Sequence, residues 1–208
     1  MNSIRRPFAY RYHNITFFLI GINLLVFVLQ QIFPRITAYM ALNLIAVRYG
    51  HWFWQFLSYM FAHGSISHLL FNLLALFVFG VQVERRMGSR EFLLYYMMTG
   101  ILAGLFSFGV YWVSGAYTVY LLGASGAIFA VQLAYAVFFP NTVLYLWGIL
   151  PLRAPVMVLG FTALELFSSL AGLNSSVAHL THLAGFGFGW LYFLVRLGLN
   201  PWKSWKRR

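Results

Sequence analysis

Apolar residues occur along this chain in long runs separated by polar or charged breaks, and this pattern predicts membrane-spanning helices. A helix that crosses a bilayer needs about 20 mostly apolar residues. The runs predict six helices, at about 15–33, 66–83, 91–112, 125–139, 154–171 and 180–197. We therefore expect an all-α polytopic membrane protein in which residues 1–208 form a single six-helix domain.

Two parts of the pattern differ from simple spans. The fourth helix, between Gly123 and Pro140, is too short to cross a membrane alone. We expect it at the centre of the bundle, because irregular backbone at membrane depth is tolerated only beside protein or water. Residues 34–62 mix apolar and polar positions and carry Trp52 and Trp54, which suit a membrane interface. We expect this segment to be an interfacial outer loop between helices 1 and 2.

Basic residues predict the orientation, because Lys and Arg collect on the cytoplasmic side of a membrane. With six spans both termini share one side, whereas five or seven spans would separate the two basic tails. The side of the termini then holds every basic residue except Arg35 and Arg48: Arg5, Arg6, Arg11, Arg85, Arg86, Arg90, Arg153, Arg196, Lys203, Lys206, Arg207 and Arg208. Both termini are therefore expected to be cytoplasmic.

The composition agrees with a membrane protein and excludes several kinds of chemistry. The chain is 62% hydrophobic and 8% charged, whereas soluble domains carry about 25% charged residues. Its net charge of +11 does not indicate nucleic-acid binding, because the basic residues flank apolar segments. With no Cys and no Asp, a thiol nucleophile, a Cys-ligated metal, an aspartyl dyad and a Ser-His-Asp triad are all excluded. We expect no cofactor and no metal.

The predicted topology brings four polar side chains to one depth, near the outer surface. Helices 2, 4 and 6 all run inwards, and near their outer ends they carry His68 and Asn72, Ser125, and His182. A serine hydroxyl needs a neighbouring base, most often His, to act as a nucleophile. The oxyanion that forms needs fixed hydrogen-bond donors, and His68 and Asn72 share a helix face because they are four residues apart. This set of residues suits acyl transfer.

Small residues would let the helices that carry Ser125 and His182 approach each other. Gly185 and Gly189 repeat on the face of His182, and Gly126, Ala130 and Ala134 form a similar stripe after Ser125. Such stripes permit close contact between membrane helices. Phe129, one turn after Ser125, either packs against the imidazole or simply belongs to the core.

In these residues the chain resembles the rhomboid family of intramembrane proteases. The segment from His63 to Asn72 looks like the family's helix 2 motif, and Glu84-Arg85-Arg86 is similar to the ExR motif that follows it. Gly123-Ala-Ser125-Gly126 matches the GxSG nucleophile motif, and His182-Leu-Ala-Gly185 with Gly189 looks like the catalytic sixth helix. The chain is most similar to the minimal six-span bacterial form, which implies a bacterial inner membrane and a site open to the outer side.

The resemblance implies a serine endopeptidase that hydrolyses peptide bonds in or next to transmembrane segments of membrane-protein substrates. It implies a Ser-His dyad without a third acid, in which Ser125 is the nucleophile and His182 the base and then the acid. His68 and Asn72 would stabilise the oxyanion with the amide of Ser125, and His63 would support the site.

Two positions differ from the family pattern. The Trp-Arg pair of the family's first outer loop is Trp54-Gln55 here, and a Tyr often found one turn after the serine is Phe129. The first difference leaves the role of that arginine unfilled, and the second removes a hydroxyl while keeping the ring.

Other interpretations remain open from the sequence. Ser125 is also a favoured helix cap, and a rhomboid-like pseudoprotease or a small transporter would also place polar residues in the membrane. Glu165, the acid inside a predicted span, is either functional or a structural hydrogen-bonding group. We interpret His179 as an interfacial loop residue. A zinc protease is excluded because no HExxH motif occurs.

Overall fold

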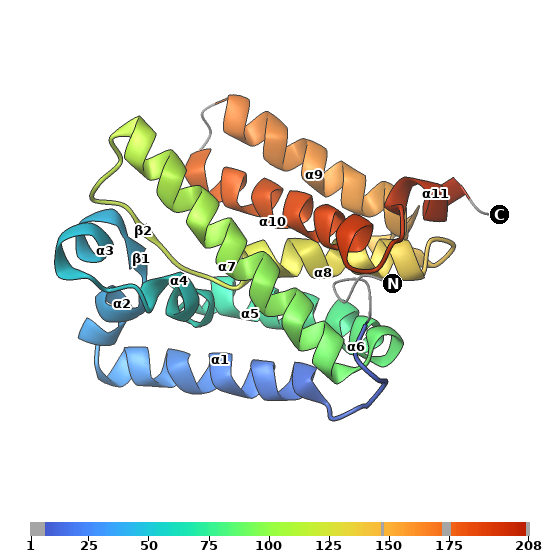
Figure 1. Ribbon diagram of the computed structural model, residues 1–208, viewed down its shortest axis with the longest axis horizontal. Helices are drawn as coiled ribbons and strands as arrows, with labels where there is room; N and C mark the ends of the chain where they lie inside the picture. The colour runs from blue at the N-terminus through green and yellow to red at the C-terminus, as the bar shows by residue number, and fades with distance from the viewer. Residues whose placement is uncertain (1–6, 147, 172–175, 207–208) are drawn as a thin grey trace.

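The computed structural model describes residues 7–146, 148–171 and 176–206, and these are mostly helical (Figure 1). Each of the apolar runs lies in a helix. The helices in chain order are α1 (Ile15–Ile32), α5 and α6 (Ile66–Ala75 and Val81–Met87) joined through a π-helical turn η3 (Leu76–Gly80), α7 (Ser89–Ser114), α8 (Ser125–Phe138), α9 (Ala154–Leu170) and α10 (Ser176–Val195). A short helix α11 (Pro201–Lys206) follows.

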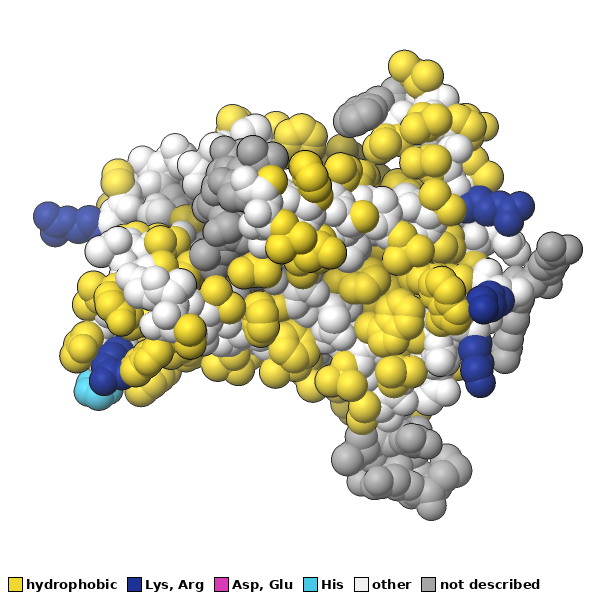
Figure 2. All heavy atoms as spheres, turned by 90° about the horizontal axis from the view of Figure 1, so that it is seen from above, with side chains coloured by type: hydrophobic (Ala, Val, Ile, Leu, Met, Phe, Trp, Pro, Cys, Tyr) yellow, Lys and Arg dark blue, Asp and Glu magenta, His cyan; other side chains and the backbone are white. Residues whose placement is uncertain are grey.

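The long helices present an apolar surface suited to lipid. Among the described residues, three helical segments are long and apolar enough to cross a membrane: Ile15–Ile32, Ile66–Met87 and Ser89–Ser114. The helices α8 and α9 are apolar but shorter. On the face shown in Figure 2, hydrophobic side chains fill the middle of the molecule while Lys and Arg side chains stand at its two ends. This distribution is typical of a protein embedded in a bilayer.

Two helices extend by about one turn beyond a predicted limit, and α7 extends by two residues at each end. The helix expected at 66–83 continues to Met87, and the helix expected at 180–197 begins at Ser176 and ends at Val195. Both added turns contain polar residues that lower the local hydropathy, so the apolar pattern does not include them. Two of these polar residues have partners in the structure, since Glu84 in α6 and His179 in α10 both make hydrogen bonds to other helices.

The segment 34–62, expected from the sequence to be an interfacial outer loop, contains short helices and a strand. It contains α2 (Arg35–Met40), β1 (Leu42–Asn43), α3 (Leu44–Gly50), α4 (Gln55–Ser58) and a 3-10 turn η2 (Tyr59–Phe61). The strand β1 pairs antiparallel with β2 (Tyr120–Leu121), which precedes the fourth apolar helix. Capping and pairing of this kind depend on contacts between distant residues, which hydropathy cannot reveal.

Gln55, which replaces the arginine of the family pattern, holds this segment together. Its side chain is fully buried. The Oε1 atom accepts from the backbone N–H of Asn43 at 3.0 Å, and Nε2 donates to the carbonyls of Ala38 and Tyr39 at 3.2 Å each. A neutral amide can satisfy both a donor and acceptors here, whereas a guanidinium only donates.

The short helix α8 lies at the centre of the bundle and contacts α5, α6, α7, α9 and α10. From Gly126 to Val137 every side chain of this helix is buried except that of Phe129. Burial on all sides explains why a helix of 14 residues is apolar around its whole circumference. Its first residue, Ser125, is half-buried at the start of this central helix.

The ends of the described chain lie together. Figure 1 shows α11 and the residues before α1 at one end of the molecule, with α2 and α3 at the other. The hairpin of β3 (Val143–Leu146) and β4 (Leu150–Arg153) connects α8 to α9. Four residues of the orientation prediction, Arg5, Arg6, Arg207 and Arg208, lie outside the described residues.

Glu84 caps the start of α1, a role that the ExR pattern did not indicate. Its fully buried carboxylate accepts the backbone N–H groups of Ile15 and Thr16 at 2.7 and 2.8 Å. It also accepts the hydroxyls of Thr16 and Ser89. The N-cap residue Asn14 makes no side-chain cap, so Glu84 satisfies backbone donors that would otherwise be unpaired at the helix start.

Replacing Glu84 with alanine should therefore destabilise the protein strongly. Hydrogen bonds to a charged group are worth about 1.5–3 kcal/mol each, and the substitution also leaves buried donors unpaired. We expect the free energy of unfolding in detergent to fall by more than about 3 kcal/mol, measured by denaturant or thermal unfolding. The matched control is Gln82→Ala in the same helix, whose side chain is exposed; equal stability of the two variants would contradict the capping role.

Candidate active site

Ser125 and His182 meet at the interface of α8 and α10. The Nε2 atom of His182 lies 2.7 Å from the Ser125 hydroxyl oxygen, which is hydrogen-bond distance. Both side chains are half-buried. Ser125 opens α8, so the first backbone N–H groups of that helix have no intrahelical acceptor and face the same region. A hydroxyl, an imidazole and free amides at one place can support nucleophilic attack on a carbonyl.

Glycine lets the two helices come close enough for this contact. A Cβ built on Gly185 would lie 1.9 Å from the carbonyl oxygen of Gly126. One on Gly189 would lie 2.6 Å from the Tyr95 hydroxyl and 3.0 Å from the Ala130 Cβ. The small-residue stripes predicted on the two helices therefore face each other across their interface.

Phe129 packs against the imidazole rather than only into the core. Its ring stacks on His182 with centroids 4.7 Å apart and planes 5° from parallel. It is also the one side chain of the α8 stretch from Gly126 to Val137 that is not buried. The stacked ring limits rotation of the imidazole and keeps Nε2 directed at Ser125.

His68 lies on α5 beside Ser125, and Asn72 follows one turn later on the same helix. A Cβ on Gly123 would lie 2.7 Å from Nε2 of His68 and 3.8 Å from the Ser125 hydroxyl, so imidazole and hydroxyl flank the same point. Gly123 has φ of +118°, which favours glycine, and it leaves the space that the His68 ring needs. The Asn72 amide is buried and donates to the His68 carbonyl at 2.8 Å; its second N–H remains for another acceptor.

His63 supports the site from behind His68. Its side chain is 2% exposed, and its ring meets that of His68 edge to face at 5.1 Å. The backbone of His63 is fixed by Gln30 of α1, which accepts its N–H at 3.0 Å and donates to its carbonyl at 3.2 Å. Burial, followed by the nearby His68, lowers the pKa of His63 to about 4, so its ring is neutral at pH 7.

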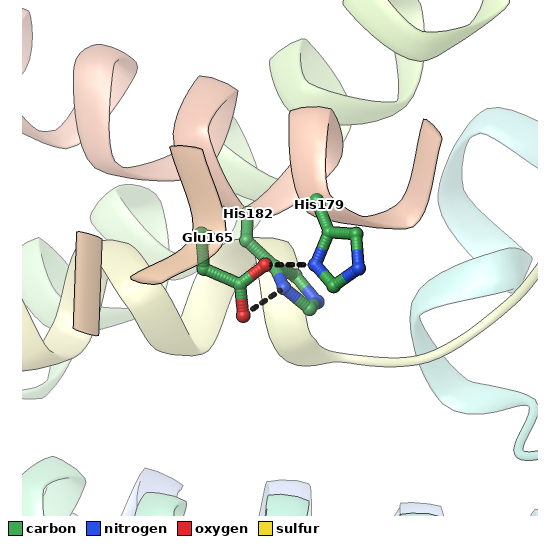
Figure 3. Close-up of side chains that lie close together, drawn as sticks. All are labelled: Glu165, His179 and His182. Atoms are coloured by element: carbon green, nitrogen blue, oxygen red, sulfur yellow. Dashed lines mark hydrogen bonds and ion pairs between the residues drawn. The ribbon is translucent and has the colours of Figure 1, made fainter. Parts of the chain in front are cut away.

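Glu165 and His179 also reach the site, and the sequence alone did not reveal this. His179 belongs to α10, so its interpretation as a loop residue is wrong. Figure 3 shows Glu165 of α9 facing His179 and His182. Its Oε2 lies 2.5 Å from Nδ1 of His179, and its Oε1 lies 3.1 Å from Nδ1 of His182. The available signal was the spacing of the two histidines, which places them on one helix face, together with a lone acid inside an apolar helix.

Comparison with known proteins identifies the family. The model of the rhomboid domain matches residues 50–198, which include all the residues of the site described so far except Gln30. The chain belongs to the rhomboid family. Family membership and the apolar helices together make it an integral membrane protein.

Several curated rhomboid proteins are similar to this chain. The rhomboid protease AarA of Providencia stuartii is 32% identical over 65% of this chain and 53% of its own length. The putative rhomboid protease YdcA of Bacillus subtilis is 32% identical, over 71% of this chain and 68% of that protein. The rhomboid protease GlpG of Haemophilus influenzae is 30% identical, over 68% and 69%. The chain thus spans about half of the Providencia relative and about two thirds of the other two.

Proposed function

We propose that this rhomboid protein is an intramembrane serine endopeptidase that cuts peptide bonds in or next to transmembrane segments of other membrane proteins. The observation that carries the proposal is the 2.7 Å contact between the Ser125 hydroxyl and Nε2 of His182. Membership of a family whose similar relatives are named rhomboid proteases supports it. The half-buried site lies between the central helix α8 and α10.

The first half of the reaction would form an acyl-enzyme. The Ser125 oxygen attacks the carbonyl carbon of the substrate, the carbonyl π electrons move to its oxygen, and the hydroxyl proton passes to Nε2 of His182. The intermediate then collapses: the C–N bond breaks, and the departing amine takes that proton from Nε2. The N-terminal part of the substrate remains as an ester on Ser125.

Water completes the cycle by the same path in reverse. His182 takes a proton from water, the resulting hydroxide adds to the ester carbon, and collapse returns the proton to the Ser125 oxygen. His68 and the amide at the start of α8 flank the point where the oxyanion would form, and Asn72 lies one turn after His68 on the same face of α5. Their positions support the assignment of these groups as its hydrogen-bond donors.

The same proposal includes the arrangement in the membrane. We assign six spans to α1, the continuous segment from α5 to α6, α7, α8, α9 and α10, with α8 buried among the others. The end that carries α11 would be cytoplasmic, in a bacterial inner membrane, and the site would open to the outer side. The positive-inside rule supports this orientation, because the described basic residues other than Arg35 and Arg48 belong to segments near that end.

The test is cleavage of a single-span model substrate by the purified protein in liposomes, with the product mapped by mass spectrometry. We expect a cut in or beside the transmembrane segment that is absent with Ser125→Ala, while both proteins remain folded. A protein that binds the substrate but never cuts it would support the pseudoprotease interpretation. A cut that persists in Ser125→Ala would overturn the assignment of the nucleophile.

A further inference from the structure

Glu165 stands where the third member of a catalytic triad would stand. It projects from α9 towards two imidazoles of α10 (Figure 3). Its two carboxylate oxygens contact different rings: Oε2 lies 2.5 Å from Nδ1 of His179, and Oε1 lies 3.1 Å from Nδ1 of His182. The other ring nitrogen of His182 is the one that contacts Ser125. The four side chains therefore form a continuous chain from hydroxyl to imidazole to carboxylate to imidazole.

The position of this carboxylate needs an explanation, because an acid inside an apolar helix is costly. Glu165 is the one ionisable residue of α9. Two residues near it on this helix, Leu164 and Phe167, have exposed fractions of 62% and 64%. The Glu165 side chain itself is only 19% exposed. Acids within membrane helices usually serve a function, and this one turns away from the exposed face to reach the two histidines.

We propose that Glu165 is a positioning residue for His182, which gives this chain a Ser125–His182–Glu165 triad in place of the dyad that the family resemblance implies. This inference rests on the proposed function. For Nε2 to accept the serine proton, the neutral ring must carry its own proton on Nδ1, and a carboxylate beside Nδ1 favours that tautomer. The same carboxylate stabilises the imidazolium that forms when Nε2 takes the proton. Glu165 stays ionised throughout, and the Nδ1 proton does not move.

His179 would fix the carboxylate in turn. Its 2.5 Å contact holds Oε2 and leaves Oε1 directed at His182. The 3.1 Å contact to His182 has the length of an ion pair but not yet the alignment of a hydrogen bond. Hydrogen bonds at active sites are often poorly aligned without substrate and tighten when it binds, and we expect this contact to tighten in the same way.

Glu165, His179 and His182 also resemble a metal-ligand set, since their ligand atoms lie within 4.8 Å of one another. Direct hydrogen bonding fits the distances better. Two ligands of a tetrahedral zinc ion, each about 2.0–2.1 Å from the metal, stand more than about 3 Å apart, whereas Oε2 and Nδ1 of His179 are 2.5 Å apart. Chelation distinguishes the hydrogen-bonded triad from a zinc site. We expect EDTA to leave the activity unchanged. A loss of activity in EDTA that added Zn²⁺ restores would overturn the triad.

The main test uses Glu165→Gln, which keeps the shape of the side chain and removes its charge. We expect kcat for a single-span substrate to fall about 10- to 1000-fold with KM within about twofold, because the lost interaction forms in the transition state. Labelling of Ser125 by a fluorophosphonate should slow in parallel, since it reports activation of the hydroxyl without docking of a substrate helix. His179→Asn should lower the same two rates by a smaller factor.

The control is Thr162→Val, one turn earlier on α9, where the hydroxyl donates to the Val158 carbonyl of its own helix; its kcat and labelling rate should equal those of the wild type. Turnover and labelling at the wild-type rate in Glu165→Gln, or a change in KM alone, would overturn the role of Glu165. The proposed function would still stand if Ser125→Ala is inactive. Activity in Ser125→Ala would instead remove the proposed function itself. Thermal unfolding of each variant keeps loss of fold separate from loss of rate.

Discussion

Replacing His182 with alanine should lower the turnover of a single-span substrate at least about 10⁴-fold. The variant keeps the Ser125 hydroxyl and the free amides of α8, but it loses the imidazole that lies at hydrogen-bond distance from that hydroxyl and would take its proton. The protein should stay folded, because the ring is half-buried and the substitution leaves the close approach of Gly185 to Gly126 and of Gly189 to Ala130 unchanged. Steady-state cleavage together with thermal unfolding measures both quantities.

The matched control is His13→Ala, a histidine with an exposed side chain before α1. It should retain full turnover. Added imidazole should restore part of the activity of His182→Ala, since the cavity left by the ring can admit a free base, and should not affect His13→Ala. Turnover near the wild-type rate in His182→Ala would contradict the assignment of the base.

The second large effect is expected at Gly185. A methyl group there would lie 1.9 Å from the Gly126 carbonyl oxygen, and the atom it meets is backbone that cannot rotate away. Gly185→Ala should therefore push α10 away from α8 and separate His182 from Ser125. Because a misplacement of about 1 Å can cost about 10²-fold in rate, we expect a loss of at least that size, measured as kcat/KM, with a lower unfolding temperature.

Gly187→Ala provides the comparison, because a Cβ at this neighbouring position on α10 meets nothing within 4 Å. It should leave both activity and unfolding temperature unchanged. If Gly185→Ala behaves like Gly187→Ala, then the close approach of α8 and α10 does not hold the site together.

The sequence predicted the helices because lipid imposes a simple rule: a segment of the right length must be apolar and helical. It also predicted that Ser125 and His182 meet. Successive spans run in opposite directions, so the fourth and sixth helices both begin on the same side of the membrane and carry these residues at the same depth. Hydropathy did not predict the extension of the second helix to Met87, where buried Glu84 lowers the apolar average while capping α1. Nor did it predict that residues 34–62 are folded.

The contacts of Glu165 are the part of the site that the sequence did not predict. Its position inside an apolar run was visible, but its partners were not, because the packing of α9 against α10 cannot be derived from the hydropathy of either helix. The face shared by His179 and His182 was visible, although our interpretation of His179 as a loop residue hid it. Which residues of two packed helices face each other depends on the rotation of each helix about its own axis, and hydropathy does not determine that rotation.

Peptide mapping after fluorophosphonate treatment tests the central claim most directly, because this reagent forms a covalent bond only with a serine that a neighbouring base activates. We expect one adduct, on the peptide that contains Ser125, formed rapidly in the wild-type protein and at least about 10²-fold more slowly in His182→Ala. A protein that cleaves its substrate while Ser125 stays unlabelled, or labels equally fast without His182, would contradict the account.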